Sequence, residues 1–572
     1  MSTLRNARGM GMRKLAWVVP AMLLAAGQVI ADDRVTLVTA ARIHTMDVAK
    51  PVASAMAYDK DGRILAVGDV DALAKRYPQA RRQDLGKATL VPGLIDAHAH
   101  VGGLGLAMIT ADLVGTRDKV EILQRLRTHA KTLKPGEWLI GGGWDQNDWP
   151  EKVFPSAADL DAAFPDRPVW LSRVDGHAGW ANSAAMRAVR RSLAGAWQPD
   201  GGRIDRDAAG EPTGLFIDNA MLLLEQARPP MSETTIEHAL RTAMRAAASQ
   251  GLTGVHDAGV SLAELRRFQR LADRGQLPLR ITAMADGDGE ALESLCRNGL
   301  YRHASGRLQM RAVKLYADGA LGSRGAAMLE DYSDDHGNRG LMVMSPAQLA
   351  AATAKAKRCG VQAATHAIGD RGNRETLDVY AKALGADAAG DHRWRIEHAQ
   401  VLAPQDLPRL AGLHVIASMQ PTHATSDMPW AQDRVGPERI VGAYAWRQLR
   451  DSGARLALGS DFPVERVDPR LGLASAVTRA DADGLPVGGW YPNEKLTAYE
   501  ALRGFTLDAA HAGFAEAEVG SLQAGKRADF LVLAEDPLAV PGEALRALRV
   551  LATYVDGEPV YEATGKASAA AP

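Results

Sequence analysis

The feature that most constrains the fold is a regular alternation of short apolar segments with helical stretches along most of the chain. The helical stretches, such as residues 344–359, carry apolar side chains at helical spacing. Eight strand-like segments occur at residues 89–98, 251–259, 277–285, 308–319, 360–369, 392–400, 413–421 and 454–463. Repeated strand–helix units of this kind close into a parallel barrel. We therefore predict an α/β fold, a (β/α)8 TIM barrel, over residues 91–515.

Two parts of the chain do not fit the alternation. The segment between the first and second strands is too long for one crossover, so residues 111–240 should form an insertion that covers the active site. Both ends of the chain read as short strands and turns. We expect residues 32–90 and 516–563 to form one small β-sandwich, and residues 564–572 to be a disordered tail.

The N-terminus has the three-part pattern of a secretory signal. Basic residues precede an apolar run from Leu15 to Ala31, which ends in the small residues Val29 and Ala31. The run is short against the roughly 20 residues that a membrane span needs. We predict a signal peptide over residues 1–31, a periplasmic or secreted protein, and no stable membrane insertion after cleavage. An uncleaved anchor is the alternative, and translation from Met12 would leave an equally good signal.

Composition excludes several kinds of partner. Lys and Arg number 67 against 68 Asp and Glu, for a formal net charge of −1, so nothing indicates nucleic-acid binding. The two cysteines, Cys296 and Cys359, are too few for a disulfide scaffold or a cysteine-based zinc site. We expect two buried free thiols, with a single bridge as the alternative. A homodimer is left open.

Histidines mark the ends of several predicted strands. His98 and His100 are two residues apart on the first strand, so both side chains project to one face and can share a divalent ion. A His-x-His pair alone is more often an ordinary polar loop. His366 ends the fifth strand, His398 the sixth, and Asp461 follows the eighth. Because barrel enzymes build their active sites at these strand ends, we predict a metal site there.

Lys314 stands within the fourth strand among Ala, Val and Leu. A buried lysine is costly if it is charged and unpaired. Pairing with Asp318 is one solution. The other is a neutral amine, which can take up carbon dioxide to become a carbamate ligand.

Taken together, these motifs resemble the amidohydrolase superfamily over essentially the whole mature chain. The resemblance rests on "VPGLIDAHAH", the strand-four lysine, the histidines of strands five and six, "GSD" on strand eight, and "GSLQAGKRADFLVL". More narrowly, the chain resembles the amidohydrolase-3 group, which includes N-substituted formamide deformylases. The narrower match rests on "GGGWDQNDWP", "DGHAGWANSAA", "VKLYADGALGSRGAAM", "HAIGDRGNRETLD" and "MQPTHATSDMPW".

The resemblance implies a ligand set and an activity. One zinc ion would be bound by His98, His100 and Asp461, a second by His366 and His398, with carbamylated Lys314 between them. Without carbamylation, a single metal would remain. Zinc lowers the pKa of bound water from 15.7 to about 7 and polarises a carbonyl. The implied reaction is hydrolysis of a non-peptide C–N bond in a small-molecule amide or N-substituted formamide.

Further residues are candidates for catalysis. Asp461 can act as ligand and general base together. His423, after strand seven, can stabilise the tetrahedral oxygen or merely cap a turn. In the insertion, His177 could equally be a catalytic residue or a structural one. For Trp144 and Asn182 we favour a structural role in the insertion's own fold.

The sequence leaves the roles of several residues, and the exact reaction, undecided. Asp318 and Arg324 either contact substrate or hold the loop after Lys314, and His256 has no counterpart in the superfamily pattern. On the same fold the enzyme could be a cyclic amidase, a deaminase or an N-acyl amino acid hydrolase, with Arg324 or Arg371 meeting a substrate carboxylate. A non-catalytic barrel binding protein is the rival from another class, although a pure binder has no need of Asp461.

Overall fold

Eight parallel strands form the centre of the protein, and each coincides with one of the segments predicted from the sequence. In the computed structural model, which describes residues 32–563, they are β6 (Leu94–Ala99), β13 (Leu252–Val260), β14 (Arg280–Asp286), β16 (Leu308–Tyr316), β17 (Gln362–Ala367), β18 (Arg395–His398), β19 (Ile416–Met419) and β20 (Leu456–Leu458). They pair in chain order, all parallel, from β6 to β20. The short strand β15 (Tyr301–Arg302) adds to β16. The predicted (β/α)8 barrel is confirmed.

The seam between the last and first strands is closed by hydrogen bonds at the barrel mouth. The backbone N–H of Asp461 donates to the carbonyl of His98 at 2.7 Å. Asp96 accepts the backbone N–H groups of His98 at 3.1 Å and Ser460 at 3.0 Å, and the hydroxyl of Ser460 at 2.6 Å. Asp96 therefore fixes the two ends of the barrel against each other where His98 and Asp461 lie.

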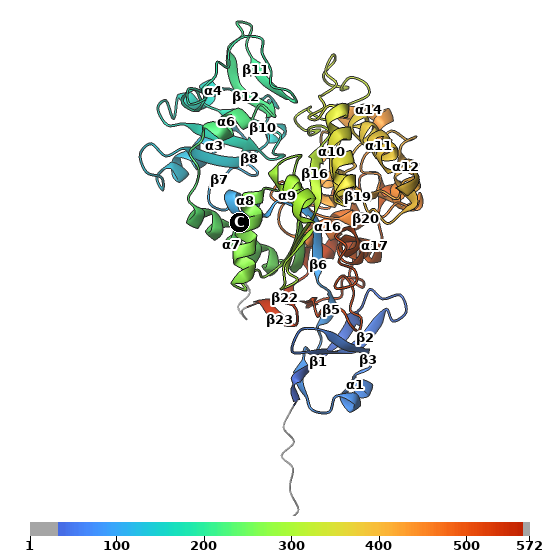
Figure 1. The fold of residues 1–572 in the computed structure, drawn as a ribbon. Coiled ribbons are helices and arrows are strands. Elements are labelled where there is room, and N and C mark those ends of the chain that lie inside the picture. Colours follow the sequence, from blue (N-terminus) through green and yellow to red (C-terminus); the bar gives the residue numbers. More distant parts are fainter. Residues whose placement is uncertain (1–31, 564–572) are drawn as a thin grey trace, which may run out of the picture.

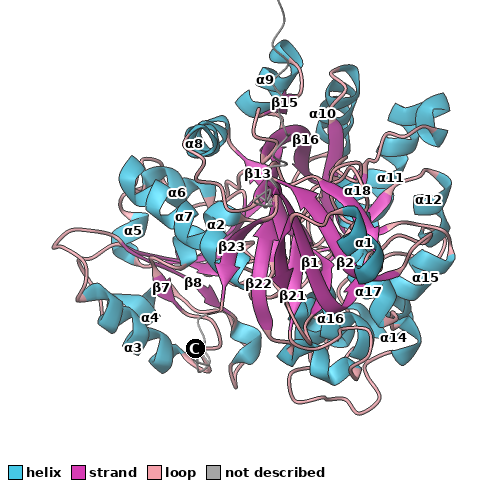
Figure 2. Ribbon diagram, turned by 90° about the horizontal axis from the view of Figure 1, so that it is seen from below, coloured by secondary structure: helices cyan, strands magenta, loops and turns pink. Residues whose placement is uncertain are grey.

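Helices surround the strands (Figure 2). They are α2 (Val101–Ala107), α7 (Glu233–Ser249), α8 (Leu262–Asp273), α9 (Glu290–Asn298), α10 (Pro346–Arg358), α11 (Asp370–Leu384), α12 (Leu407–Gly412), α13 (Pro421–Asp427), α14 (Ala431–Arg439), α15 (Trp446–Asp451), α16 (Pro469–Thr478), α17 (Ala498–Gly504) and α18 (Leu507–Ala512). Serine side chains cap three of them: Ser232 begins α7, Ser261 α8 and Ser345 α10. Their inner faces pack into one large core with the barrel, as Phe268 of α8 does.

Cys296 of α9 and Cys359 at the end of α10 form a disulfide, with their Cα atoms 4.9 Å apart. The expectation of two free thiols was wrong. The two cysteines are 63 residues apart in the chain, and spacing alone could not pair them. They meet because the helices α9 and α10 follow the neighbouring strands β14 and β16.

The two ends of the chain share one sheet. It contains β1 (Asp32–His44), β2 (Val52–Asp59), β3 (Ile64–Gly68), β4 (Ala80–Asp84), β5 (Thr89–Pro92), β21 (Phe530–Leu533), β22 (Val550–Val555) and β23 (Glu558–Glu562), with α1 (Val70–Arg76) against it. The strands β5 and β21 pair antiparallel, joining the two ends. Val38, Leu90 and Phe530 contribute to their common core.

The segment after α2 forms a second, separate sheet. Its strands are β7 (Ala111–Asp112), β8 (Leu139–Trp144), β9 (Val169–Arg173), β10 (Ala178–Ala181), β11 (Gly202–Arg206) and β12 (Pro212–Asp218), and its helices are α3 (Lys119–Ala130), α4 (Ala157–Asp161), α5 (Ser183–Met186) and α6 (Leu222–Ala227). The sheet has two small cores of its own, one around Trp144 and Trp180 and one around Trp170 and Phe216. In Figure 1 this insertion lies at the top left and the terminal sheet at the bottom, with the barrel between them.

The predictions of a signal at residues 1–31 and of a tail at 564–572 lie outside the described residues. Within residues 32–563, no helix combines the length and the apolar character that a membrane span requires.

Candidate metal centre

Histidine rings from three barrel strands meet at the barrel mouth. The ring centroids of His98 and His398 are 4.9 Å apart, those of His366 and His398 4.6 Å, and those of His98 and His100 5.4 Å. Each side chain comes from the C-terminal end of β6, β17 or β18 or from the residue that follows. The strand-end positions recognised in the sequence therefore lie together in space.

Asp461 completes the cluster from the loop after β20. Its Oδ1 atom lies 3.1 Å from His100 Nε2 and 3.6 Å from His98 Nε2, and Oδ2 lies 4.0 Å from His398 Nδ1. Asp461 has a φ of 63° and His398 a φ of 75°, in the left-handed region that costs non-glycine residues free energy. The fold holds both residues in this strained conformation at the centre.

The chemistry of this donor set fits a divalent cation. One ligand atom each of His98, His398 and Asp461 lies within 4.8 Å of the others, and all three residues are buried. The Oδ1 atom of Asp461 is buried without a satisfactory hydrogen bond among the described residues, which a cation would remedy. Imidazole nitrogen and carboxylate oxygen are ligands that zinc accepts.

The buried imidazoles are in the neutral form that binds metals. Burial, with nearby Lys314, lowers the pKa of His98 to about 4. Burial also holds the pKa of His366 and of His398 well below the ordinary value. All three rings therefore offer lone pairs at neutral pH.

Glu397 orients the first of these ligands. Its Oε2 atom lies 2.5 Å from His98 Nδ1, which turns the Nε2 atom of His98 toward the centre. Arg395 contacts Glu397 with Nε at 2.7 Å and Nη2 at 3.0 Å. Burial alone would raise the pKa of Glu397, but the charge of Arg395 and the hydrogen bond with His98 hold it far below its usual range. This pair was not found from the sequence, although two charged residues alternating on a buried strand were a signal for it.

Lys314 is 1% exposed, and its Nζ atom lies 3.0 Å from His98 Nε2. Burial lowers its pKa, although the carboxylates of Asp461 and Glu397 oppose this. Asp318, the other partner considered from the sequence, instead accepts backbone N–H groups from three residues, Ala327, Ile368 and Gly369, at 2.8–2.9 Å. Asp318 thus holds the loops around the mouth, and Lys314 faces the histidines.

His423 lies in the first turn of α13, which begins at Pro421 after β19. Its ring stacks on that of His398 at 5.9 Å, and its Nε2 atom lies 3.7 Å from Asp461 Oδ2. Nε2 is buried with no hydrogen-bond partner among the described residues. An unpaired buried nitrogen beside the cluster is available for a reacting group.

His177 reaches the cluster from the insertion, on the loop between β9 and β10. Its ring centroid lies 4.9 Å from that of His366, and its Nδ1 atom lies 2.6 Å from Asp218 Oδ1. Burial lowers the pKa of His177, but the hydrogen bond to Asp218 and its charge outweigh burial, so the pKa is raised. Asp218 was not found from the sequence, because the two residues are 41 positions apart.

The other insertion residues hold its fold. The indole N–H of Trp144 donates to the carbonyl of Leu171 at 3.0 Å. The side chain of Asn182 accepts the N–H of Val169 at 2.9 Å and that of Ala185 in α5 at 2.9 Å. These contacts agree with the structural interpretation of Trp144 and Asn182.

None of the remaining charged candidates contacts the cluster of histidines directly. Arg324 pairs with Asp334 at 2.9 Å. Arg371 is exposed in α11. His256 lies inside the barrel, where its Nδ1 atom is 2.8 Å from Arg395 Nη1. It thus belongs to the network behind Glu397.

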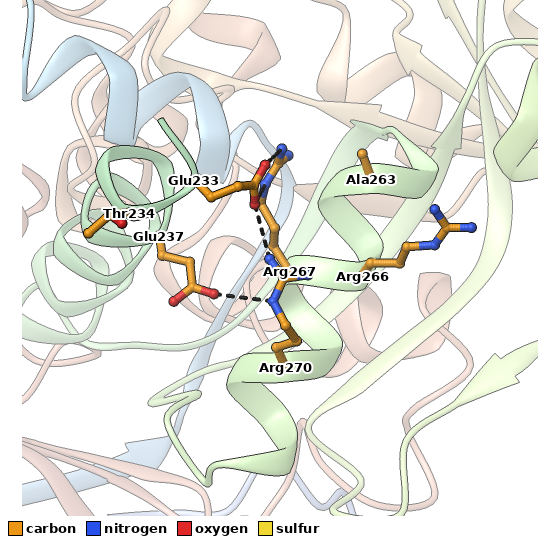
Figure 3. A pocket seen from close by; sticks show the side chains of 7 residues that line it. All are labelled: Glu233, Thr234, Glu237, Ala263, Arg266, Arg267 and Arg270. Carbon is orange, nitrogen blue, oxygen red and sulfur yellow. Dashed lines mark hydrogen bonds and ion pairs between the residues drawn. The ribbon is translucent and has the colours of Figure 1, made fainter. Parts of the chain in front are cut away.

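A cavity of about 550 Å³ lies elsewhere, between α7 and α8 (Figure 3). It is lined by Glu233, Thr234, Glu237, Ala263, Arg266, Arg267 and Arg270. Arg267 and Arg270 pair with Glu233 at 2.6 and 3.1 Å. Most of its charges neutralise one another, and none of the candidate metal ligands lines it.

The fold and this centre define a TIM-barrel protein of the metal-dependent hydrolase type. Residues 81–561 match the family model described as "Amidohydrolase family". The chain belongs to the amidohydrolase family, as its motifs predicted, and is a hydrolase of carbon–nitrogen bonds other than peptide bonds.

Two relatives and one solved structure match this chain over nearly their whole lengths. The chain is 31% identical to an N-substituted formamide deformylase of Arthrobacter pascens over 545 residues, 92% of this chain and 98% of the relative. It is 35% identical to the protein LONG AFTER FAR-RED 3 of Arabidopsis thaliana over 561 residues, 96% of this chain and 94% of the relative. A crystal structure of an uncharacterized metal-dependent hydrolase from Pyrococcus horikoshii superposes with a TM-score of 0.72 and 27% identity, covering 89% of this chain and 99% of that one.

Proposed function

We propose that the protein hydrolyses an N-substituted formamide, or a closely related small-molecule amide, with the help of a divalent metal ion. The observation that carries this proposal is the convergence of His98, His398 and Asp461 at the barrel mouth. The similarity to the Arthrobacter deformylase over 92% of the chain supports the substrate class.

The cluster would hold zinc. We propose one ion on His98, His100 and Asp461, a second on His366 and His398, and carbamylated Lys314 between them. The neutral rings support this assignment, and so does the buried amine of Lys314, whose lowered pKa favours the uncharged form that reacts with carbon dioxide. A bound divalent ion lowers the pKa of water and polarises a carbonyl group.

Asp461 would transfer the proton during hydrolysis. Burial would raise the pKa of Asp461, but His100, His98 and His398 hold it well below its usual range, so the carboxylate is ionised. Asp461 accepts a proton from the attacking water and passes it to the leaving nitrogen. The new C–O bond forms, the C–N bond breaks, and the products are formate and an amine.

Two further histidines would stabilise the reacting group. The free Nε2 atom of His423 can donate to the oxygen that becomes negative in the tetrahedral intermediate. His177 lies on the side of His366 and can contact the same substrate from above the mouth. Both would act as catalytic residues in contact with substrate.

Screening the purified protein against panels of N-formyl, N-acyl and cyclic amides tests the substrate class. Formate and amine should be released together from N-formyl compounds. A further panel of amidines tests the deaminase alternative, which release of ammonia would identify. For the N-acyl amino acid alternative, Arg324 already pairs with Asp334, so Arg371, which is exposed, would have to meet the substrate carboxylate. A non-catalytic binding protein would release nothing from any panel.

We also propose export to the periplasm or the medium, with no nucleic-acid partner. Disulfides persist in oxidising compartments, so the bond between Cys296 and Cys359 supports this location, as does the signal-like N-terminus. Fractionation with mass spectrometry of the mature chain tests it. A new N-terminus at Asp32 is expected, and an uncleaved chain in the cytosol would contradict export.

A further inference from the structure

The insertion supplies one candidate catalytic residue, His177, and the side chain of Asp218 lies between that residue and a loop of the barrel. Asp218 ends β12 and has a φ of 50°, in the left-handed region. A non-glycine residue held in this conformation carries strain, which persists where surrounding contacts determine it. The contacts of Asp218 show what holds it there.

Asp218 and His177 are joined twice. The carboxylate Oδ1 atom lies 2.6 Å from His177 Nδ1, and the backbone N–H of Asp218 donates to the carbonyl of His177 at 3.0 Å. The side chain of Asp218 is 2% exposed. The ring and the backbone of His177 are therefore fixed by the same residue, in a site that largely excludes water.

The other oxygen of Asp218 faces the barrel. A Cβ atom on Gly319 would lie 2.6 Å from Asp218 Oδ2, and one on Gly325 would lie 3.0 Å from it. Both glycines belong to the loop that follows β16, and the carbonyl of Gly319 lies 3.3 Å from His366 Nε2. The absence of side chains at these two positions makes room for the carboxylate beside the metal centre.

We propose that Asp218 is a positioning residue that holds His177 at the candidate metal centre and keeps its Nε2 atom turned toward the reacting group. Because Nδ1–H is donated to the carboxylate, Nε2 is the nitrogen left for substrate; among the described residues it has no hydrogen-bond partner. This inference rests on the proposed function, in which His177 contacts substrate. It adds that the insertion acts on the reaction through this one pair.

The test compares Asp218→Asn, His177→Ala and the double variant. Asp218→Asn keeps the shape but weakens the acceptor, and it should lower kcat about 10- to 100-fold, as loss of a supporting carboxylate does. KM and metal content should change by less than about threefold. Adding Asp218→Asn to His177→Ala should cost less than about twofold more, because the two residues act as a unit.

Asp205→Asn is the matched control. Asp205 lies on β11 in the same hairpin and accepts the hydroxyl of Thr213 at 2.7 Å. Its substitution removes a comparable carboxylate contact in the insertion and should leave kcat near that of the wild type. Equal losses for Asp205→Asn and Asp218→Asn, or additive losses in the double variant, would overturn the inference in favour of a purely structural role.

Amide hydrogen exchange of residues 174–178 provides a readout that needs no substrate. Asp218→Asn should speed exchange in this loop, and Asp205→Asn should not; unchanged exchange would overturn the inference. An inactive wild type would instead count against the proposed function, and the exchange measurement would still decide the role of Asp218. An active wild type with an unaffected His177→Ala variant would end the proposed role of both residues.

Discussion

The barrel mouth and the insertion place histidines at the same centre by different means. The barrel ligands are attached to strands whose parallel ladders run from β6 to β20, so many backbone hydrogen bonds determine where they lie. His177 depends on a loop, in which Asp175 accepts its backbone N–H, and on the carboxylate of Asp218, which contacts its ring, in a sheet with its own small cores. The barrel should thus determine whether metal binds, and the insertion how fast the bound substrate reacts.

The largest effect is expected for Asp461→Asn. Removal of the ionised carboxylate takes away both a candidate ligand and the proton carrier, so kcat/KM should fall at least about 1,000-fold. Metal analysis alongside kinetics should show a reduced metal content. Asp451→Asn is the control, because Asp451 is exposed at the end of α15. Full activity of Asp461→Asn would break the assignment of the centre.

Glu397→Gln should weaken the centre from inside the barrel. Loss of the carboxylate that orients His98 should lower metal affinity and activity about 10- to 100-fold. Arg395 would also be left as a buried charge without its partner, which destabilises folding by about 3–5 kcal/mol. Chelator titration and denaturant unfolding measure the two effects. An unchanged metal affinity would show that the orientation of His98 does not depend on Glu397.

Asn182→Ala should affect the insertion and spare the barrel. The side chain of Asn182 accepts two hydrogen bonds from backbone N–H groups. It also donates to the carbonyls of Phe164 at 2.8 Å and Arg167 at 2.9 Å. Its loss should lower the free energy of unfolding by about 2 kcal/mol. Metal content should remain that of the wild type. A parallel loss of metal would show that the two regions do not fold as independently as their separate cores indicate.

The smallest effect is expected for Glu500→Gln in α17, as a change in the free energy of unfolding that depends on pH. The pKa of Glu500 in α17 falls to about 2, since its hydrogen bonds with Arg447 and Thr497 and the charge of Arg450 outweigh burial. Because the folded-state pKa is depressed, the stabilisation is present above pH 4.5 and is lost as pH falls from 4.5 toward 2. Glu500→Gln should therefore cost about 1 kcal/mol at neutral pH and little at pH 2. Unfolding curves at both pH values measure this, and equal costs would contradict it.

Much of the candidate centre could be predicted because it follows strand periodicity. His98 and His100 are two residues apart, and His366, His398 and Asp461 each end a segment whose apolar pattern was visible. Parallel barrel strands bring their C-terminal ends to one mouth, so local pattern was sufficient to group these residues.

The sequence by itself determined the barrel, the strand ends and the family, because a period of two along a strand decides which side chains share a face. Only the tertiary structure decided the disulfide between Cys296 and Cys359, the support of His98 by Glu397, and the hold of Asp218 on His177. Each of these pairs joins residues 41 to 299 positions apart. No local pattern relates such residues, and they meet only because packing brings neighbouring helices, opposite strands and two paired antiparallel strands within bonding distance.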